Sequence, residues 1–136
     1  MIPVYIVTGF IGSGKSTFIN EQLQYRKKLG GTACISAEQG SVSLIKDALQ
    51  LSPDKLSAIT PNQPDTYSSI ADEIATYINK TNPKEIWIEW NGMFSFQQLE
   101  LIFFNSILKE FCRLERVIYT AKSNSITSMI QALGDR

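Results

Sequence analysis

An apolar stretch that runs directly into a glycine-rich turn is the feature that most limits how this 136-residue chain can fold. Residues 2–7 are rich in β-branched side chains, which is typical of a buried strand. The next residues, Gly9-Phe10-Ile11-Gly12-Ser13-Gly14-Lys15-Ser16, match the pattern G-x-x-x-x-G-K-[ST]. A helical pattern then covers residues 15–28 and ends at Gly30-Gly31. A strand, a glycine loop and a helix in this order predict a phosphate-binding loop.

The chemistry of that loop follows from its geometry. Glycine lets the chain curl tightly, so that several backbone N–H groups converge on one anion. The helix that follows directs its unpaired N–H groups and the positive end of its dipole at the same anion. We expect Lys15 to reach the β and γ phosphates, Ser16 to bind Mg²⁺ and Thr17 to contact the α phosphate. The expected nucleotide-binding residues of this loop are Gly9, Gly12, Ser13, Gly14, Lys15, Ser16 and Thr17. The alternative is a glycine-rich turn with a surface lysine.

A second part of the predicted site follows the apolar strand expected at 85–90. Glu89 lies near the end of that strand, and ligands of open α/β sheets gather where strands end. Glu89 is therefore expected to face the Mg²⁺ ion, for which carboxylate oxygens are suitable ligands. Gly92 is expected to offer its N–H to the γ phosphate. The alternative is that Glu89 is a solvated strand end without a function.

The order of the predicted elements favours an α/β fold with a mainly parallel sheet, because strands and helices alternate along the chain. One helix is marked by the apolar spacing of Tyr67, Ile70, Ala71, Ile74 and Ile78, with Asp65 or Thr66 as its N-cap. The other expected elements are strands at 2–7, 32–36, 56–60, 85–90 and 115–121 and helices at 15–28, 42–51, 96–111 and 126–133. Residues 1–136 are expected to form one domain.

The segments "VTGFIGSGKSTFIN" and "IEWNG" together resemble the CobW/HypB/UreG group of P-loop GTPases, and CobW-like proteins most closely. The resemblance implies a three-layer P-loop NTPase fold and Mg²⁺-dependent GTP hydrolysis. The segment "ISAEQGSVSLIKDAL" is similar to the first switch of that family, which makes Glu38 and Gly40 candidates. Glu38 would orient water or contact the metal. The catalytic residues implied are Lys15, Glu38 and Glu89.

The chain departs from the family pattern in three places. The interval "LSAITPNQPDTYSS" lacks the Gly-Cys-x-Cys-Cys metal motif, and Trp90 and Asn91 replace the small hydroxyl residues common between the Glu and the Gly of E-x-x-G. The guanine-reading N-K-x-D motif is absent, and Thr120-Ala121-Lys122-Ser123 is the nearest segment. In the family that motif lies further along the chain, before a C-terminal domain. We therefore expect an N-terminal portion of the nucleotide-binding domain, incomplete at its C-terminus, that binds GTP and ATP with affinities within about tenfold.

Composition limits the other classes of function. Thirteen basic and thirteen acidic side chains cancel, which gives no argument for binding nucleic acid or an anionic membrane. The chain has no histidine, and Cys34 and Cys112 are isolated, so no zinc site is expected. The apolar run 2–11 is too short to span a bilayer and no signal peptide begins the sequence, so the cytoplasm is the expected location.

These patterns leave three hypotheses for function. The first is an Mg²⁺-dependent GTPase that switches or loads a protein partner, a metalloprotein or a transporter by analogy with metal homeostasis. The second is a regulatory module that binds nucleotide without hydrolysing it. The third is a small-molecule kinase, but the sequence shows no arginine-rich lid segment to support this hypothesis. The predicted helix 96–111 is apolar around much of its circumference, which indicates a core helix or, alternatively, a partner or homodimer face.

Replacing Lys15 tests the phosphate-loop assignment. We expect Lys15→Ala to abolish binding of Mg²⁺-GTP, because the variant lacks the cation that faces the β and γ phosphates. Isothermal titration of GTP in the presence of Mg²⁺ measures this directly. Equal affinities of the wild type and the variant would refute the assignment.

Overall fold

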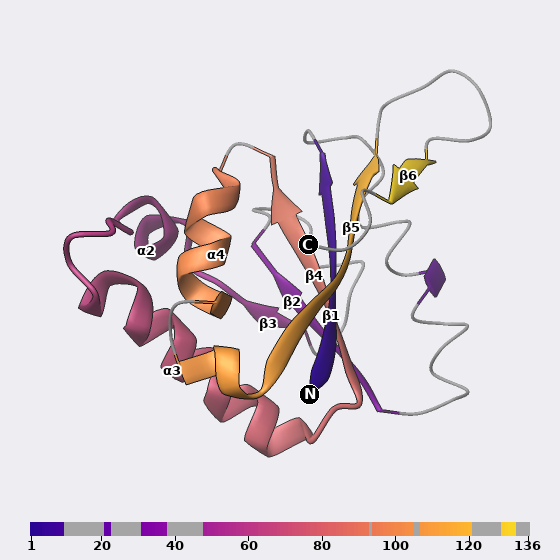
Figure 1. Cartoon of the computed structure of the whole chain (residues 1–136), viewed down its shortest axis with the longest axis horizontal. Coiled ribbons are helices and arrows are strands. Elements are labelled where there is room, and N and C mark those ends of the chain that lie inside the picture. The colour runs from indigo at the N-terminus through magenta and orange to yellow at the C-terminus, as the bar shows by residue number, and fades with distance from the viewer. Residues whose placement is uncertain are drawn as a thin grey trace.

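The computed structural model describes residues 1–9, 21–22, 31–37, 48–92, 94–104 and 107–120, and the backbone of 129–132. Its centre is a sheet with the strand order β3-β2-β4-β1-β5-β6 (Figure 1). The strands are β1 (Ile2–Gly9), β2 (Thr32–Ser36), β3 (Leu49–Gln50), β4 (Glu85–Asn91), β5 (Cys112–Thr120) and β6 (Met129–Ala132). The helices are α2 (Pro53–Ser57), α3 (Asp65–Thr81), α4 (Phe96–Phe104) and the short 3-10 helix η2 (Ile107–Glu110).

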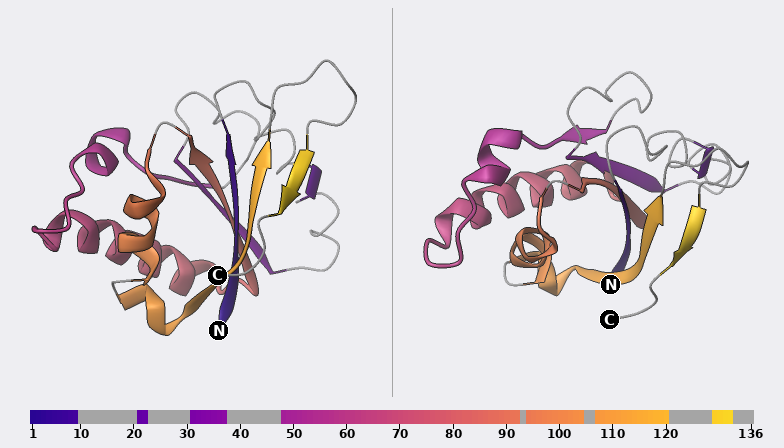
Figure 2. Two further views of the ribbon diagram at one scale, coloured as in Figure 1. Left: turned by 45° about the horizontal axis from the view of Figure 1, so that its top comes forward. Right: turned by 90° about the horizontal axis from the view of Figure 1, so that it is seen from above.

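The sheet is parallel from β3 to β5, as the alternating pattern predicts, and among the described strands only β6 runs antiparallel to its neighbour. The arrowheads of β1, β4 and β5 accordingly point to one edge of the sheet (Figure 2). This arrangement confirms an α/β fold of the P-loop NTPase type, with a parallel sheet flanked by helices. It also brings the ends of β1 and β4 together, because Gly9 is paired with Asn91.

Among the described residues, the larger buried cluster lies on the side of the sheet that α3 and α4 cover, which we call the helix face. Alternate residues of the central strands, such as Ile6 and Ile88, pack there against Ile74 of α3 and Ile102 of α4. The intervening residues of the same strands point to the opposite face, where Val7, Cys34, Trp87 and Ile118 form a smaller buried cluster. The two faces follow from the strand period of two residues.

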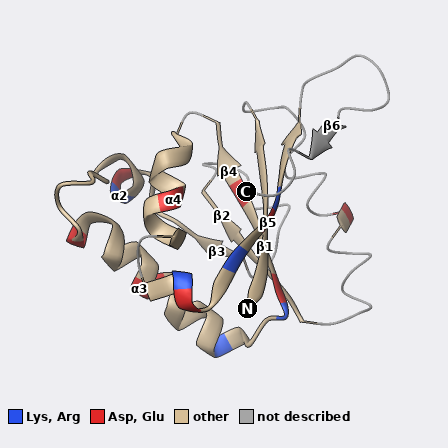
Figure 3. Ribbon diagram, viewed as in Figure 1, with Lys and Arg blue, Asp and Glu red and all other residues tan. Residues whose placement is uncertain are grey.

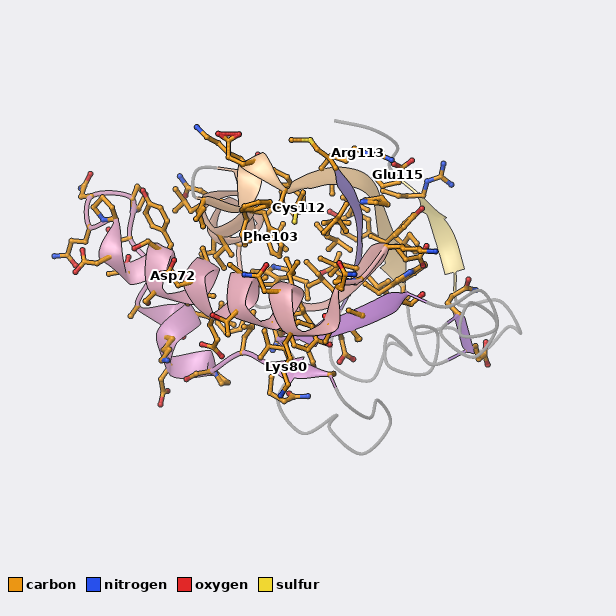
Figure 4. The ribbon with its side chains drawn as sticks, turned by 90° about the horizontal axis from the view of Figure 1, so that it is seen from below. Asp72, Lys80, Phe103, Cys112, Arg113 and Glu115 are labelled. Carbon is orange, nitrogen blue, oxygen red and sulfur yellow. The ribbon has the colours of Figure 1, made fainter. Side chains whose placement is uncertain are left out.

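Helix α3 shows how the sequence fixes the helix face. Its apolar residues recur at helical spacing, and Ile70, Ala71, Ile74 and Ile78 are buried as predicted. Figure 4 shows Phe103 of α4 in the interior beside α3, whereas Asp72 and Lys80 lie on the outward side of α3. The helix ends at Asn82, whose left-handed conformation lets its N–H donate to the carbonyl of Ile78.

The predicted N-cap of this helix was wrong. Pro64 occupies that position and makes no side-chain cap bond, while Asp65 is the first residue of the helix. The hydroxyl of Thr66 instead accepts a hydrogen bond from the Thr60 N–H, at 3.0 Å, and donates to the carbonyl of Gln63, at 2.6 Å. Thr66 therefore stabilises the turn before the helix.

Several other predicted elements differ in the structure. The strand predicted at 56–60 is wrong, because α2 occupies Pro53–Ser57: Ser52 is its N-cap and Pro53 its first residue, a position that suits proline. The helix predicted at 42–51 does not extend to its end, since Leu49–Gln50 pairs with β2. The helix predicted at 96–111 stops at Phe104 and is followed by η2.

The predicted helix at 126–133 is also wrong over its described part. Met129–Ala132 forms β6, which pairs antiparallel with Ile118–Thr120 of β5. The open edge of β5 offers backbone partners, and their pairing outweighs the helical spacing of a short apolar segment. Strand β5 itself begins three residues earlier than predicted, at Cys112. The predicted helix 15–28 lies outside the described residues except for Glu21 and Gln22, which are helical.

Acidic and basic residues are interspersed along the described part of the ribbon (Figure 3). On β5, the Arg113 guanidinium forms an ion pair with the Glu115 carboxylate. No helix within the described ranges is long and apolar enough to cross a membrane.

Truncating a core residue of α3 tests the account of the helix face. The side chain of Ile74 is fully buried, so Ile74→Ala should lower the free energy of unfolding by about 2–5 kcal/mol. The exposed residue Asn79 of the same helix is the matched control, and Asn79→Ala should change it by no more than about 0.5 kcal/mol. Urea unfolding followed by circular dichroism measures both values. Equal losses would contradict the assignment of Ile74 to the core.

Candidate functional site

The candidate site lies at the edge of the sheet where the parallel strands end. Gly9 ends β1, and Gly92 follows β4 directly. The N–H of Gly92 donates to the carbonyl of Gly9 at 3.1 Å, so the two glycines of the predicted site are in direct contact. Gly9 has a φ of 150°, a backbone conformation that glycine adopts without a steric penalty.

Glu89 lies two residues before the end of β4, between β1 and β2. It is paired with Val7 of β1 and with Ser36 of β2, and it points to the opposite face together with Trp87 and Cys34. Its exposed fraction is 0%, which rules out the alternative of a solvated strand end. A buried carboxylate is costly unless hydrogen bonds or a cation stabilise it.

Ser36 supplies one such hydrogen bond. Its hydroxyl donates to Oε1 of Glu89 at 2.9 Å, and its side chain is 1% exposed. The N–H of Ala37, the residue after β2, donates to the Glu89 carbonyl at 2.8 Å, so Ser36 and Ala37 hold both the side chain and the backbone of Glu89. Sequence reasoning missed Ser36. The available signal was a hydroxyl residue at the end of an apolar strand in a parallel sheet.

Cys34 is the next residue toward the start of β2 that points to the opposite face. Burial, and secondarily the negative charge of Glu89, raise the pKa of its thiol from its ordinary 9.0 to about 12. The thiol is therefore protonated at neutral pH. The carboxylate oxygens of Glu89, one of which accepts the hydrogen bond from Ser36, suit a hard cation such as Mg²⁺.

The remaining predicted site residues lie outside the described part of the chain: Gly12, Ser13, Gly14, Lys15, Ser16, Thr17, Glu38 and Gly40. The structure thus brings together Gly9, Glu89 and Gly92. Within the described ranges, no group of three or more His, Cys, Asp or Glu side chains is placed to hold a metal ion. One carboxylate does not conflict with Mg²⁺, which commonly binds through one or two carboxylates, water and the phosphates of a nucleotide.

A cavity elsewhere in the molecule has a different character. It has a volume of about 430 Å³, and its lining residues are Phe96, Glu100, Phe104, Cys112, Arg113 and Leu114. It lies between α4 and the start of β5, whereas Gly9, Glu89 and Gly92 lie toward the ends of β1 and β4. Burial raises the pKa of Cys112 to about 11, so its thiol is also protonated at neutral pH. We assign no part of the candidate site to this cavity.

The sequence was compared with models of known protein families. The model of the CobW/HypB/UreG nucleotide-binding domain matches residues 3–133. The chain belongs to the CobW/HypB/UreG family. A comparison with curated proteins gave no match. Membership of the CobW/HypB/UreG family supports a P-loop protein that binds GTP, and the match extends from β1 through the described part of β6.

The raised pKa of Cys34 gives a pH-dependent prediction. The folded chain favours the protonated thiol, which contributes to the free energy of unfolding. This contribution is fully present below pH 9 and is lost as the pH rises from 9 toward 12. The free energy of unfolding should therefore fall more steeply above pH 9 in the wild type than in Cys34→Ala. Urea unfolding at pH 8, 9, 10 and 10.5 measures both slopes. Parallel slopes would contradict the prediction.

Proposed function

We propose that this chain is an Mg²⁺-dependent GTP-binding protein of the CobW-like type that hydrolyses GTP. The observation that carries the proposal is Glu89, a fully buried carboxylate beside the end of the strand that leads into the sequence Gly9-Phe10-Ile11-Gly12-Ser13-Gly14-Lys15-Ser16. A core position costs a charged group much of its solvation free energy, so its presence there favours a role with a cation.

In this proposal different residues of the chain bind the phosphates, the metal ion and the attacking water. Lys15 and the amides of the glycine loop hold the phosphates, with Gly12, Ser13, Gly14 and Thr17 as part of that loop. Ser16 and Glu89 hold the Mg²⁺ ion, and Glu38 orients the attacking water or contacts the metal. Bound Mg²⁺ neutralises charge that develops on the phosphate oxygens. Most of the catalysis is then positioning and electrostatic stabilisation.

In this mechanism the N–H of Gly92 has to change its hydrogen-bond partner. Its N–H donates to the Gly9 carbonyl, so it must leave that partner before it can donate to a γ phosphate. The bond lies between two backbone groups, and the phosphate would offer a charged acceptor in exchange, which forms a stronger hydrogen bond. Binding of a triphosphate would thus separate Gly92 from Gly9, and loss of the γ phosphate would allow them to pair again.

The same contact favours one second candidate, a module that binds nucleotide without turnover. A chain that keeps Gly92 bonded to Gly9 would hold the nucleotide but would not bring that amide to the γ phosphate. Under either candidate the protein would act on a protein partner. By analogy with the family, we propose a metalloprotein or a transporter in metal homeostasis, and the cytoplasm as the location.

Glu89→Gln tests the proposed function. The variant keeps the shape of the side chain but loses the charge that faces the metal, so turnover of GTP should fall by about 10- to 1,000-fold. Affinity for the nucleotide should stay within about tenfold, because the glycine loop and Lys15 supply most of the phosphate contacts. Phosphate release under saturating GTP measures turnover, and a titration with a fluorescent GTP analogue measures affinity.

Two results would contradict a part of the proposal. Wild-type turnover in Glu89→Gln would exclude Glu89 from the catalytic site. Tight binding of Mg²⁺-GTP by a wild-type chain that releases no phosphate would instead favour the module that binds without turnover.

A further inference from the structure

The hydrogen bond between Ser36 and Glu89 has a consequence for the proposed metal site. The terminal torsion of a glutamate side chain is broad, so packing alone fixes the plane of its carboxylate poorly. A hydrogen bond to one oxygen removes that freedom. Ser36 makes this bond to Oε1 at 2.9 Å, across the pairing of β2 with β4.

The backbone holds this pair in place. Ser36 is in register with Glu89, and the N–H of Ala37 donates to the Glu89 carbonyl at 2.8 Å. Both side chains point to the opposite face, as do Cys34 and Trp87 two residues earlier on the same strands. The position of the hydroxyl is therefore set by the sheet.

Burial makes the bond strong. The two side chains are 1% and 0% exposed, so water does not compete for the Glu89 oxygen. A hydrogen bond to an ionised acceptor is shorter and stronger than a neutral one, and a low local dielectric strengthens it further. Ser36 thus holds one oxygen of the Glu89 carboxylate through a bond that solvent does not weaken.

We propose that Ser36 is a positioning residue: its hydroxyl orients the Glu89 carboxylate for the Mg²⁺ ion that accompanies the nucleotide. The inference rests on the proposed function, in which Glu89 serves that metal. Residues that orient metal ligands in this way typically change metal affinity or activity by about 10- to 100-fold when they are lost. A purely structural hydrogen bond would change the stability of the fold but not its response to Mg²⁺.

The test measures the Mg²⁺ concentration that half-saturates binding of a fluorescent GTP analogue to the intact chain. Ser36→Ala should raise this concentration by about 10- to 100-fold, while affinity for the analogue in EDTA stays unchanged. Ser36→Thr keeps the hydroxyl and should restore the wild-type response. Cys34→Ala is the matched control, because it also removes one buried heavy atom from the same face of the same strand. It should leave the Mg²⁺ response unchanged.

A wild-type Mg²⁺ response in Ser36→Ala would overturn the inference, and so would an equal shift in Cys34→Ala. If Ser36→Ala does not fold, Ser36→Cys replaces it: a thiol is a weaker donor, and a wild-type response in that variant would overturn the inference as well. A double variant of Ser36→Ala and Glu89→Gln should shift no further than Glu89→Gln alone, because Ser36 acts through the carboxylate.

Glu89→Gln separates this inference from the proposed function. If Glu89→Gln raises the Mg²⁺ requirement and Ser36→Ala does not, the proposed metal site stands and the role of Ser36 is refuted. If neither variant changes the requirement, Glu89 does not serve the metal. In that case the proposed role of Glu89 is wrong and the inference about Ser36 falls with it.

Discussion

Strand β4 pairs in parallel with β1 on one side and with β2 on the other, and this pairing positions the whole candidate site. The pairing places Glu89 beside Val7 on one side and beside Ser36 on the other. Because parallel strands end at the same edge, it also places Gly9 next to the turn at Gly92. A shift of β4 by one residue would turn Glu89 to the helix face, among the apolar side chains of α3 and α4.

The division of the sheet into two faces explains how a charge is tolerated in the core. The helix face is apolar along the central strands and holds the larger of the two buried clusters formed by the described residues. The opposite face is apolar at Val7, Cys34 and Trp87, but carries the hydrogen-bonded pair of Ser36 and Glu89 nearer the strand ends. Among the described residues, apolar burial is therefore concentrated on the helix face. The other face can hold a polar pair at the edge where a nucleotide would bind.

The sequence predicts the central strands well, because runs rich in β-branched or aromatic residues, such as 2–7 and 85–90, favour strands. Its errors lie at short or marginal segments. Pro53 marks the start of α2 and not the end of a preceding helix, since proline suits the first turn. The apolar residues of β6 are spaced as in a helix, and only the edge of β5 makes them a strand.

In the candidate site, too, features set by neighbouring residues can be predicted, whereas contacts between residues far apart in the sequence cannot. The positions of Glu89 near the end of β4 and of Gly92 just after it can be predicted from the apolar run, while their roles remain predictions. Ser36 could not be assigned a partner, since its contact with Glu89 depends on the register of two strands 53 residues apart. The roles of Lys15, Ser16 and Glu38 remain predictions, as these residues lie outside the described part of the chain.

The central claim is that a nucleotide binds where β1, β2 and β4 end. Backbone amide spectra of the ¹⁵N-labelled chain, recorded as a non-hydrolysable GTP analogue and Mg²⁺ are added, test it most directly. The amide signals of Gly9, Ala37 and Gly92 should shift with a common affinity, while those of Thr81 and Asn82 at the opposite edge of the sheet should stay in place. Shifts at Glu100, Arg113 and Leu114 around the cavity by β5, with Gly9 and Gly92 unchanged, would contradict it.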